Sequence, residues 1–204
     1  MKSRIAISFD DGLLAQFKWA RGLYKYNISG TFYINPFNLG GYGFLTLDQL
    51  KKMKNEWGHV IANHLWLHES PATVSMEIVL GNLFAARDWL ERNGFEEGSR
   101  LLALPYGSRG GRWTEDHINV LFGECEQIRD VGSGVNHFIC KMPTAVESTD
   151  LMHIEGKLLC HYFHGNHNTS DHDFVSFLEE IENSDLEKSS MLGELEHARS
   201  HAIS

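Results

Sequence analysis

Two patterns of apolar and polar residues alternate along the chain. Short runs rich in branched and aromatic residues predict buried strands at 4–9, 31–35, 59–63, 101–104, 128–131, 137–141 and 157–163. Longer amphipathic stretches between them predict helices at 13–26, 47–56, 74–92, 114–124 and 173–182. Thr46 and Thr114 precede their helices as N-caps, and Asn93-Gly94 is expected to end the longest helix.

The order of these elements predicts an α/β fold. Strands separated by helices form βα units with parallel pairing and right-handed crossovers. About seven such strands indicate a distorted (β/α) barrel, and a doubly wound open sheet is the competing architecture. We expect residues 1–184 to form one domain, followed at 185–204 by a polar tail or a surface helix.

Composition excludes several classes of function. The 204 residues carry a formal net charge of -9, which is not the basic footprint of a nucleic-acid binder and does not favour docking on anionic membranes. The chain has no apolar run long enough to span a bilayer, and its first predicted strand leaves no room for a signal peptide, so a cytoplasmic location is expected. Cys125, Cys140 and Cys160 fit buried, reduced thiols better than a disulfide framework.

Polar side chains gather where the predicted strands end. Active sites of both competing folds form at the carboxyl ends of the strands. The residues that occupy these ends are Asp10 and Asp11, His64 and His68, the Pro105-Tyr106-Gly107 turn, and His164. The agreement among four strand ends predicts a single active site there.

His64 and His68 are spaced like metal ligands. Spacing of four residues on a helical turn brings two imidazoles to one face, and one carboxylate would complete a three-ligand site with open positions, as in catalytic metal centres. A cation also accounts for the adjacent pair Asp10 and Asp11, because one carboxylate would bind it while the other stays nearby as a base. Zinc is the default ion, and cobalt, nickel or iron would suit the same ligands.

Four motifs in order carry a family resemblance. S-F-D-D-G, H-L-W-L-H, L-P-Y-G and F-H-G resemble the motifs of the polysaccharide deacetylases, carbohydrate esterase family four, also called the NodB-homology domain. The resemblance runs from about residue 4 to 165. It implies a metal-dependent hydrolase that removes the acetyl group from an N-acetylated sugar or glycan.

The resemblance also implies roles for individual residues. Asp10 would be the general base, Asp11 with His64 and His68 would hold the metal, the Tyr106 N–H would bind the oxyanion, and His164 would be the general acid. Pro105, Trp66 and Asn35 are candidates for substrate contact. For Trp66 packing is an equal alternative, and for Asn35 the alternative is a bond to a loop backbone.

The chain departs from the family pattern at two places. Ala103 stands where the third motif has an arginine that orients the catalytic Asp. Some divergent members also lack this arginine, and Arg109 and Arg112, just downstream, are candidates to replace it. The fourth motif has no clear counterpart between residues 125 and 148, and its tryptophan normally supports the late histidine. His161, His164 and His167 are all candidates for that histidine; alternation along the strand favours His164.

Two alternative functions remain. The same scaffold could hydrolyse a non-sugar amide such as a cyclic ureide, or it could be a degenerate glycan-binding domain without catalysis. The sequence predicts neither the sugar nor the oligomeric state.

Overall fold

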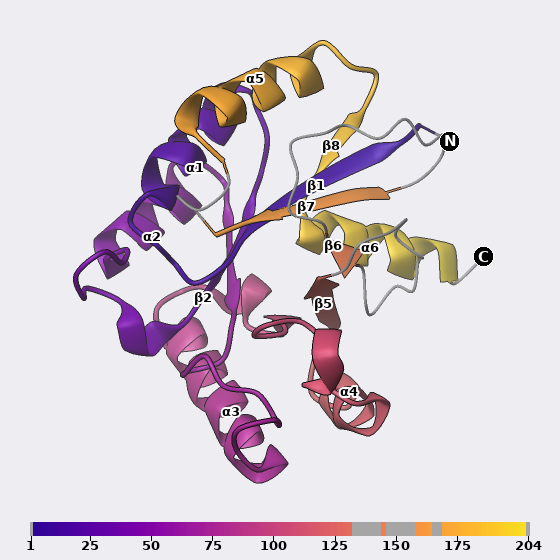
Figure 1. Ribbon diagram of the computed structural model, residues 1–204. Helices are drawn as coiled ribbons and strands as arrows, with labels where there is room; N and C mark the ends of the chain where they lie inside the picture. Colours follow the sequence, from indigo (N-terminus) through magenta and orange to yellow (C-terminus); the bar gives the residue numbers. More distant parts are fainter. Residues whose placement is uncertain (1, 132–143, 146–157, 165–168, 203–204) are drawn as a thin grey trace.

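The computed structural model describes residues 2–131, 144–145, 158–164 and 169–202, which form a parallel sheet surrounded by helices (Figure 1). The strands are β1 Arg4–Phe9, β2 Thr31–Ile34, β3 Val60–Asn63, β4 Leu101–Ala103, β5 Gln127–Val131, β6 Thr144–Ala145, β7 Leu158–Phe163 and β8 Glu187–Ser189. The α-helices are α1 Gln16–Lys25, α2 Leu47–Asn55, α3 Met76–Arg92, α4 Glu115–Phe122, α5 Asp171–Glu182 and α6 Met191–Ala202. Short 3₁₀ turns cover Pro36–Asn38, Glu96–Gly98 and Arg109–Gly111.

All strand pairs of this sheet are parallel, in the order β6-β5-β4-β3-β2-β1-β7. β1 pairs with β7 along its whole length. On its other side it pairs with β2 at Ser8 and Phe9 and with β8 at Arg4, Ile5 and Ala6. The sheet is therefore split at the start of β1. The predicted α/β fold, a distorted barrel of parallel strands, is confirmed.

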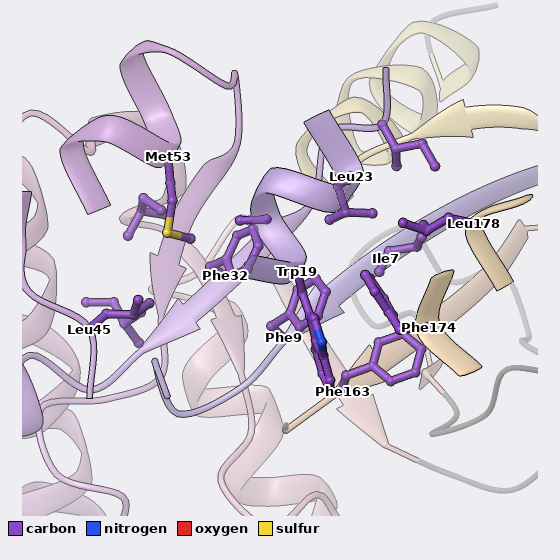
Figure 2. Close-up of a cluster of buried hydrophobic side chains, with 14 of the residues drawn as sticks. Ile7, Phe9, Trp19, Leu23, Phe32, Leu45, Met53, Phe163, Phe174 and Leu178 are labelled. Carbon is purple, nitrogen blue, oxygen red and sulfur yellow. The ribbon is translucent and has the colours of Figure 1, made fainter. Parts of the chain in front are cut away.

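The outer face of the sheet packs against helices. Along β1, alternate residues Ile7 and Phe9 face this side, as the period of two in a strand requires. Phe9 stacks on Phe32 with ring centroids 4.6 Å apart, and Trp19 of α1 stacks on Phe174 of α5 at 4.9 Å (Figure 2). This aromatic core fixes the strands whose ends carry the polar motifs.

The intervening residues point to the inner face of the sheet. Small and apolar side chains such as Ala6, Ala62 and Ala103 gather there with Met191 and Leu195 of α6. The segment expected as a tail or surface helix thus contains a strand and a helix whose apolar residues are buried in the core.

A buried ion pair joins α6 to β1. Arg4 Nε lies 3.0 Å from Glu194 Oε1, and both side chains are almost fully buried. The pair lies at the amino end of β1, at the opposite end of the strand from Asp10 and Asp11.

Local sequence signals set the helix ends. Thr46 and Thr114 cap α2 and α4 with capping boxes, and α3 ends at Arg92, where Gly94 has a φ of +85°. These three predictions are confirmed. The expected strand at 137–141 lies outside the described residues, and the short strands β6 and β8 were not predicted. In the described part of the chain, no helix combines the length and apolar character needed to cross a bilayer.

Candidate active site

Backbone hydrogen bonds continue past the strand ends and order the site. The Asp10 N–H donates to the Phe163 carbonyl at 3.0 Å, and the His64 N–H donates to the Ile34 carbonyl at 3.1 Å. The residues that follow β1 and β3 therefore leave the sheet from fixed positions.

Asp11, His64 and His68 form the cluster that the sequence predicted. Asp11 Oδ1 lies 3.4 Å from His64 Nε2 and 3.5 Å from His68 Nε2, and the three ligand atoms all lie within 4.8 Å of one another. Ligand atoms of a tetrahedral site with bonds of about 2.1 Å are about 3.4 Å apart, so the spacing fits one ion.

The chemistry of His64 fits the same ion. His64 Nδ1 lies 2.9 Å from the carbonyl of Ala103, which assigns the ring proton to Nδ1 and leaves the lone pair on Nε2. That Nε2 is buried and has no hydrogen-bond partner among the described residues. A buried nitrogen acceptor that lacks a donor and lies beside a carboxylate fits the role of a metal ligand.

The electrostatics favour the ligand forms of these residues at neutral pH. Burial raises the pKa of Asp11, but contact with His64 and the nearby His68 and His164 lower it more, to about 2. Burial and the neighbouring His64 lower the pKa of His68 to about 4. A cation would thus meet the carboxylate of Asp11 and the neutral imidazole of His68, as metal binding requires.

Backbone strain marks the same strand ends. Asp11, Leu65 and Tyr106 have φ values of +74°, +65° and +64°, a region that residues other than glycine rarely adopt. Among the described non-glycine residues only Asn27, a tolerant residue type in a turn, shares this conformation. Strained residues persist where the surroundings impose them, and they cluster at functional sites.

Asn35 supports the loop that carries the histidines. Its side chain is fully buried, and its Nδ2 donates to the carbonyls of His64 at 2.5 Å and Leu65 at 3.1 Å. Asn63 Oδ1 accepts the Leu65 N–H at 2.8 Å from the other side. Of the two alternatives for Asn35, these bonds support the one to the loop backbone, and substrate contact by Asn35 stays a prediction.

The Pro105-Tyr106 turn lies next to His68. The Tyr106 ring packs edge-on against His68 at 4.3 Å and is half exposed. Pro105 is buried, and its carbonyl accepts the Trp113 Nε1–H at 2.9 Å. The Ser108 N–H donates to Asp130 at 2.7 Å, which anchors the end of the turn. Of this turn, Tyr106 is the part available to a substrate.

His164 lies at the end of β7 and faces the same site. Gln16 of α1 donates from Nε2 to the carbonyls of Asp10 at 2.5 Å and His164 at 2.7 Å, so one amide ties two strand ends together. The sequence analysis missed Gln16. His161 is buried against Phe177 of α5, on the helix side of the sheet. His167 lies outside the described residues.

Asp10 forms an ion pair that the sequence did not reveal. Arg129 Nη2 of β5 lies 2.5 Å from Asp10 Oδ1 and 2.6 Å from Oδ2, and both side chains are buried. In a flat sheet β5 and β1, four strands apart, would be about 19 Å apart. The contact therefore requires the strong curvature of a barrel.

The arginine that contacts Asp10 is neither of those considered from the sequence. Arg112 lies over the Tyr106 ring, 5.4 Å from its centroid, and the side chain of Arg109 lies outside the described residues. Charged residues within a buried strand, Arg129 and Asp130 of β5, were the one signal for Arg129. Trp66, the remaining candidate for substrate contact, is half buried near His68, and its main-chain N–H donates to the Asn82 carbonyl at 3.1 Å.

Comparisons with known proteins agree with this geometry. A family model described as "Polysaccharide deacetylase" matches residues 1–121. No match was found among curated proteins.

Solved structures share the fold at low sequence identity. The Streptococcus pyogenes deacetylase PplD, solved in complex with acetate, is 16% identical with a TM-score of 0.62, over 85% of this chain and 69% of that one. The Bacillus subtilis peptidoglycan deacetylase PdaC is 17% identical with a TM-score of 0.65, over 99% and 95%. The Bacillus cereus polysaccharide deacetylase BC0361 is 18% identical with a TM-score of 0.58; the match covers 85% of this chain but only 50% of that protein.

Proposed function

Because this chain belongs to the polysaccharide deacetylase family, we propose that it hydrolyses the acetamido group of an N-acetylated sugar or glycan with the help of one divalent metal ion. The observation that carries the proposal is the convergence of Asp10, the Asp11-His64-His68 cluster and His164 at neighbouring strand ends. A base, a metal site and an acid within one site are the parts that amide hydrolysis needs.

Asp11, His64 and His68 would hold the ion, and zinc is the default for this donor set. When bound, such an ion lowers the pKa of a water molecule and polarises the acetyl carbonyl. The three residues leave the remaining coordination positions open, which is the arrangement of a catalytic centre.

Asp10 accepts a proton from the attacking water in this proposal. Its carboxylate is held by Arg129 and is separate from the three ligands, so it remains available as a base. The new bond forms between the water oxygen and the carbonyl carbon. The developing negative charge on the carbonyl oxygen is met by the Tyr106 N–H, which the strained turn presents.

His164 donates a proton to the leaving amine. The carbon–nitrogen bond breaks more easily when nitrogen leaves as a neutral amine, and the products are acetate and the free amino sugar. Gln16 holds the main chain of His164 and that of Asp10 together, which fixes the acid relative to the base.

The nature of the substrate follows from the family. The deacetylases that share this fold include one named for peptidoglycan and one solved with acetate, the product expected here. An acetylated glycan or a smaller acetylated sugar is the proposed substrate class. The cytoplasmic location remains a prediction.

The test begins with protein purified without a metal-affinity tag. Elemental analysis should find a divalent transition metal, and the metal-loaded protein should release acetate from N-acetylglucosamine oligomers. A panel that includes cyclic ureides separates the sugar amide from other amides. Metal-loaded protein that releases no acetate but still binds glycan would contradict the proposal and establish a binding domain instead.

A further inference from the structure

The Arg129 side chain lies on the inner face of the sheet and is completely buried. Its guanidinium carbon lies over two tyrosine rings, 5.0 Å from the Tyr33 centroid and 5.1 Å from the Tyr162 centroid. These rings belong to β2 and β7, which pair with β1 on its two sides at the end that carries Asp10. They restrict the plane of the guanidinium, since a cation stacks over an aromatic face.

Asp10 is the one carboxylate that contacts this cation among the described residues. Burial by itself lowers the pKa of Arg129, but the contact with Asp10, together with the nearby Tyr33 and Tyr162, raises it more, and the net shift is upward. One nitrogen, Nη2, donates to both oxygens of Asp10. The carboxylate is therefore fixed in rotation about its own carbon–carbon bond as well as in position.

Ala103 is the register partner of Arg129 on the adjacent strand β4. Its side chain lies on the same inner face and ends at a methyl group, so it leaves room for the longer side chain to cross toward β1. A long cation at 103 would start one strand closer to Asp10. An arginine at position 103 of β4 or at position 129 of β5 would thus lie on the inner face, and this chain has its arginine at position 129.

We propose that Arg129 is the positioning residue of the base: it holds Asp10 toward the attacking water and away from the Asp11-His64-His68 cluster. The proposal rests on the proposed function, because Asp10 acts as a base only if the protein is a hydrolase. An adjacent carboxylate free to rotate would be drawn to a divalent cation and would become a further ligand. With both oxygens engaged by Arg129, Asp10 stays out of the coordination sphere.

A purely structural ion pair is the competing explanation, and the fold contains a matched control for it. Arg4 and Glu194 are also a buried arginine–carboxylate pair, located at the opposite end of β1. Breaking either pair leaves a buried charge without its partner and destabilises the fold. Only the pair at Asp10 should affect the chemical step.

The experiment compares Arg129→Met with Arg4→Met in the metal-loaded protein. For Arg129→Met we expect kcat to fall about 100-fold, the loss typical of a misplaced catalytic group, while KM changes little. Both substitutions should lower the urea midpoint of unfolding by a similar amount. Arg4→Met, however, should leave kcat near the wild-type value. Equal kcat values for wild type and Arg129→Met, or equal losses in both variants, would overturn the proposal.

A relocated arginine supplies the second arm. Arg129→Ala combined with Ala103→Arg moves the guanidinium to the adjacent strand on the same face. We expect the kcat of this double variant to be at least about tenfold higher than that of Arg129→Ala. Arg129→Ala alone is the reference. If the double variant folds but its kcat equals that of Arg129→Ala, positioning by a guanidinium is not the role.

A structural readout separates this proposal from the proposed function. Crystal structures of zinc-soaked wild type and Arg129→Met should show Asp10 outside the coordination sphere in the first and turned toward the ion in the second. This result would stand even if no acetate were released from any substrate, which would contradict the proposed function alone. An unmoved Asp10 in Arg129→Met would overturn the positioning role whatever the activity.

Discussion

The side-chain amide of Asn35 and the main-chain carbonyl of His64 are joined by a hydrogen bond of 2.5 Å. Asn35 follows β2 and His64 follows β3, so the end of one strand supports the proposed ligand that follows the next. The same amide holds the carbonyl of Leu65, whose backbone is in the left-handed region. The loop that carries the proposed ligands His64 and His68 is thus held by a residue outside the proposed ligand set.

Asn35→Ala should weaken metal binding without removing a ligand. We expect the affinity for zinc to fall about 10- to 100-fold, as for other supporting residues of metal sites. Loss of the donor leaves two buried carbonyls unpaired, which should lower the free energy of unfolding by about 1–3 kcal/mol. Metal titration and urea unfolding measure the two effects.

Asn183→Ala is the matched control for Asn35→Ala. Asn183 also donates its amide to a carbonyl, that of Glu179 at 2.8 Å, but it is exposed at the end of α5. This variant should bind zinc like the wild type. Equal zinc affinity in both variants would show that Asn35 does not support the ligand loop.

Asp10→Asn and His64→Ala should separate the base from the metal site. Asp10→Asn keeps an oxygen for Arg129 but removes the proton acceptor, so turnover should be lost while metal content stays near one per chain. His64→Ala removes a ligand and should strip the metal. Elemental analysis with an acetate-release assay tests both variants.

His161→Ala serves as the control for the loss of a buried histidine. His161 packs against Phe177 on the helix side of the sheet, so its loss should leave the metal in place. Metal loss in Asp10→Asn would indicate that the two carboxylates have exchanged roles. Full metal content in His64→Ala would exclude His64 as a ligand.

Most of the fold could be predicted because its signals are local. Period-two apolar runs and the capping residues Thr46 and Thr114 depend on a few neighbouring positions. The C-terminal segment was harder, since its polar surface concealed the contribution of Met191 and Leu195 to the inner core. The pairing of β8 with β1 depends on tertiary packing, and Glu187–Ser189 carries no apolar strand pattern.

The candidate site divides in the same way. Asp11, His64 and His68 lie in short motifs, and the structure brings them together as predicted. Arg129 contacts Asp10 across 119 positions of sequence, and the contact exists only because the sheet curls. Gln16 acts on backbone carbonyls, which carry no residue signature, whereas for Asn35 the sequence had left such a bond as one of two alternatives. Sequence motifs thus found the groups proposed to do the chemistry, and the contacts that Arg129 and Gln16 make with them became visible only in the fold.

Tyr106→Gly should distinguish the backbone of the turn from the side chain. Glycine adopts a φ of +64° without strain, so the N–H keeps its direction and stability should rise by up to about 1 kcal/mol. If only the N–H acts on the oxyanion, kcat should stay within a fewfold of wild type. If Tyr106→Gly loses most of its kcat while Tyr106→Phe keeps a kcat near that of the wild type, the role belongs to the aromatic ring instead.

His59 should make stability depend on pH, independently of the active site. Its Nδ1 accepts the Gly30 N–H at 3.1 Å and its Nε2 donates to the Ala20 carbonyl at 2.8 Å, so the buried ring is held in its neutral form. Burial lowers the pKa of His59 to about 4, against 6.5 for an ordinary histidine, and the bond to Ala20 opposes the shift only in part. A second proton would face the Gly30 N–H.

The sign of the effect follows from which state binds the proton more readily. Between pH 6.5 and 4 the unfolded chain protonates His59 and the folded protein does not, so stability is full above this window and falls as the pH drops through it. The contribution lost is up to about 3 kcal/mol. His59→Gln can keep both hydrogen bonds with a group that does not titrate. Urea unfolding at pH 7 and pH 4.5 should therefore show a larger loss for wild type than for His59→Gln, and equal losses would exclude His59 as the source.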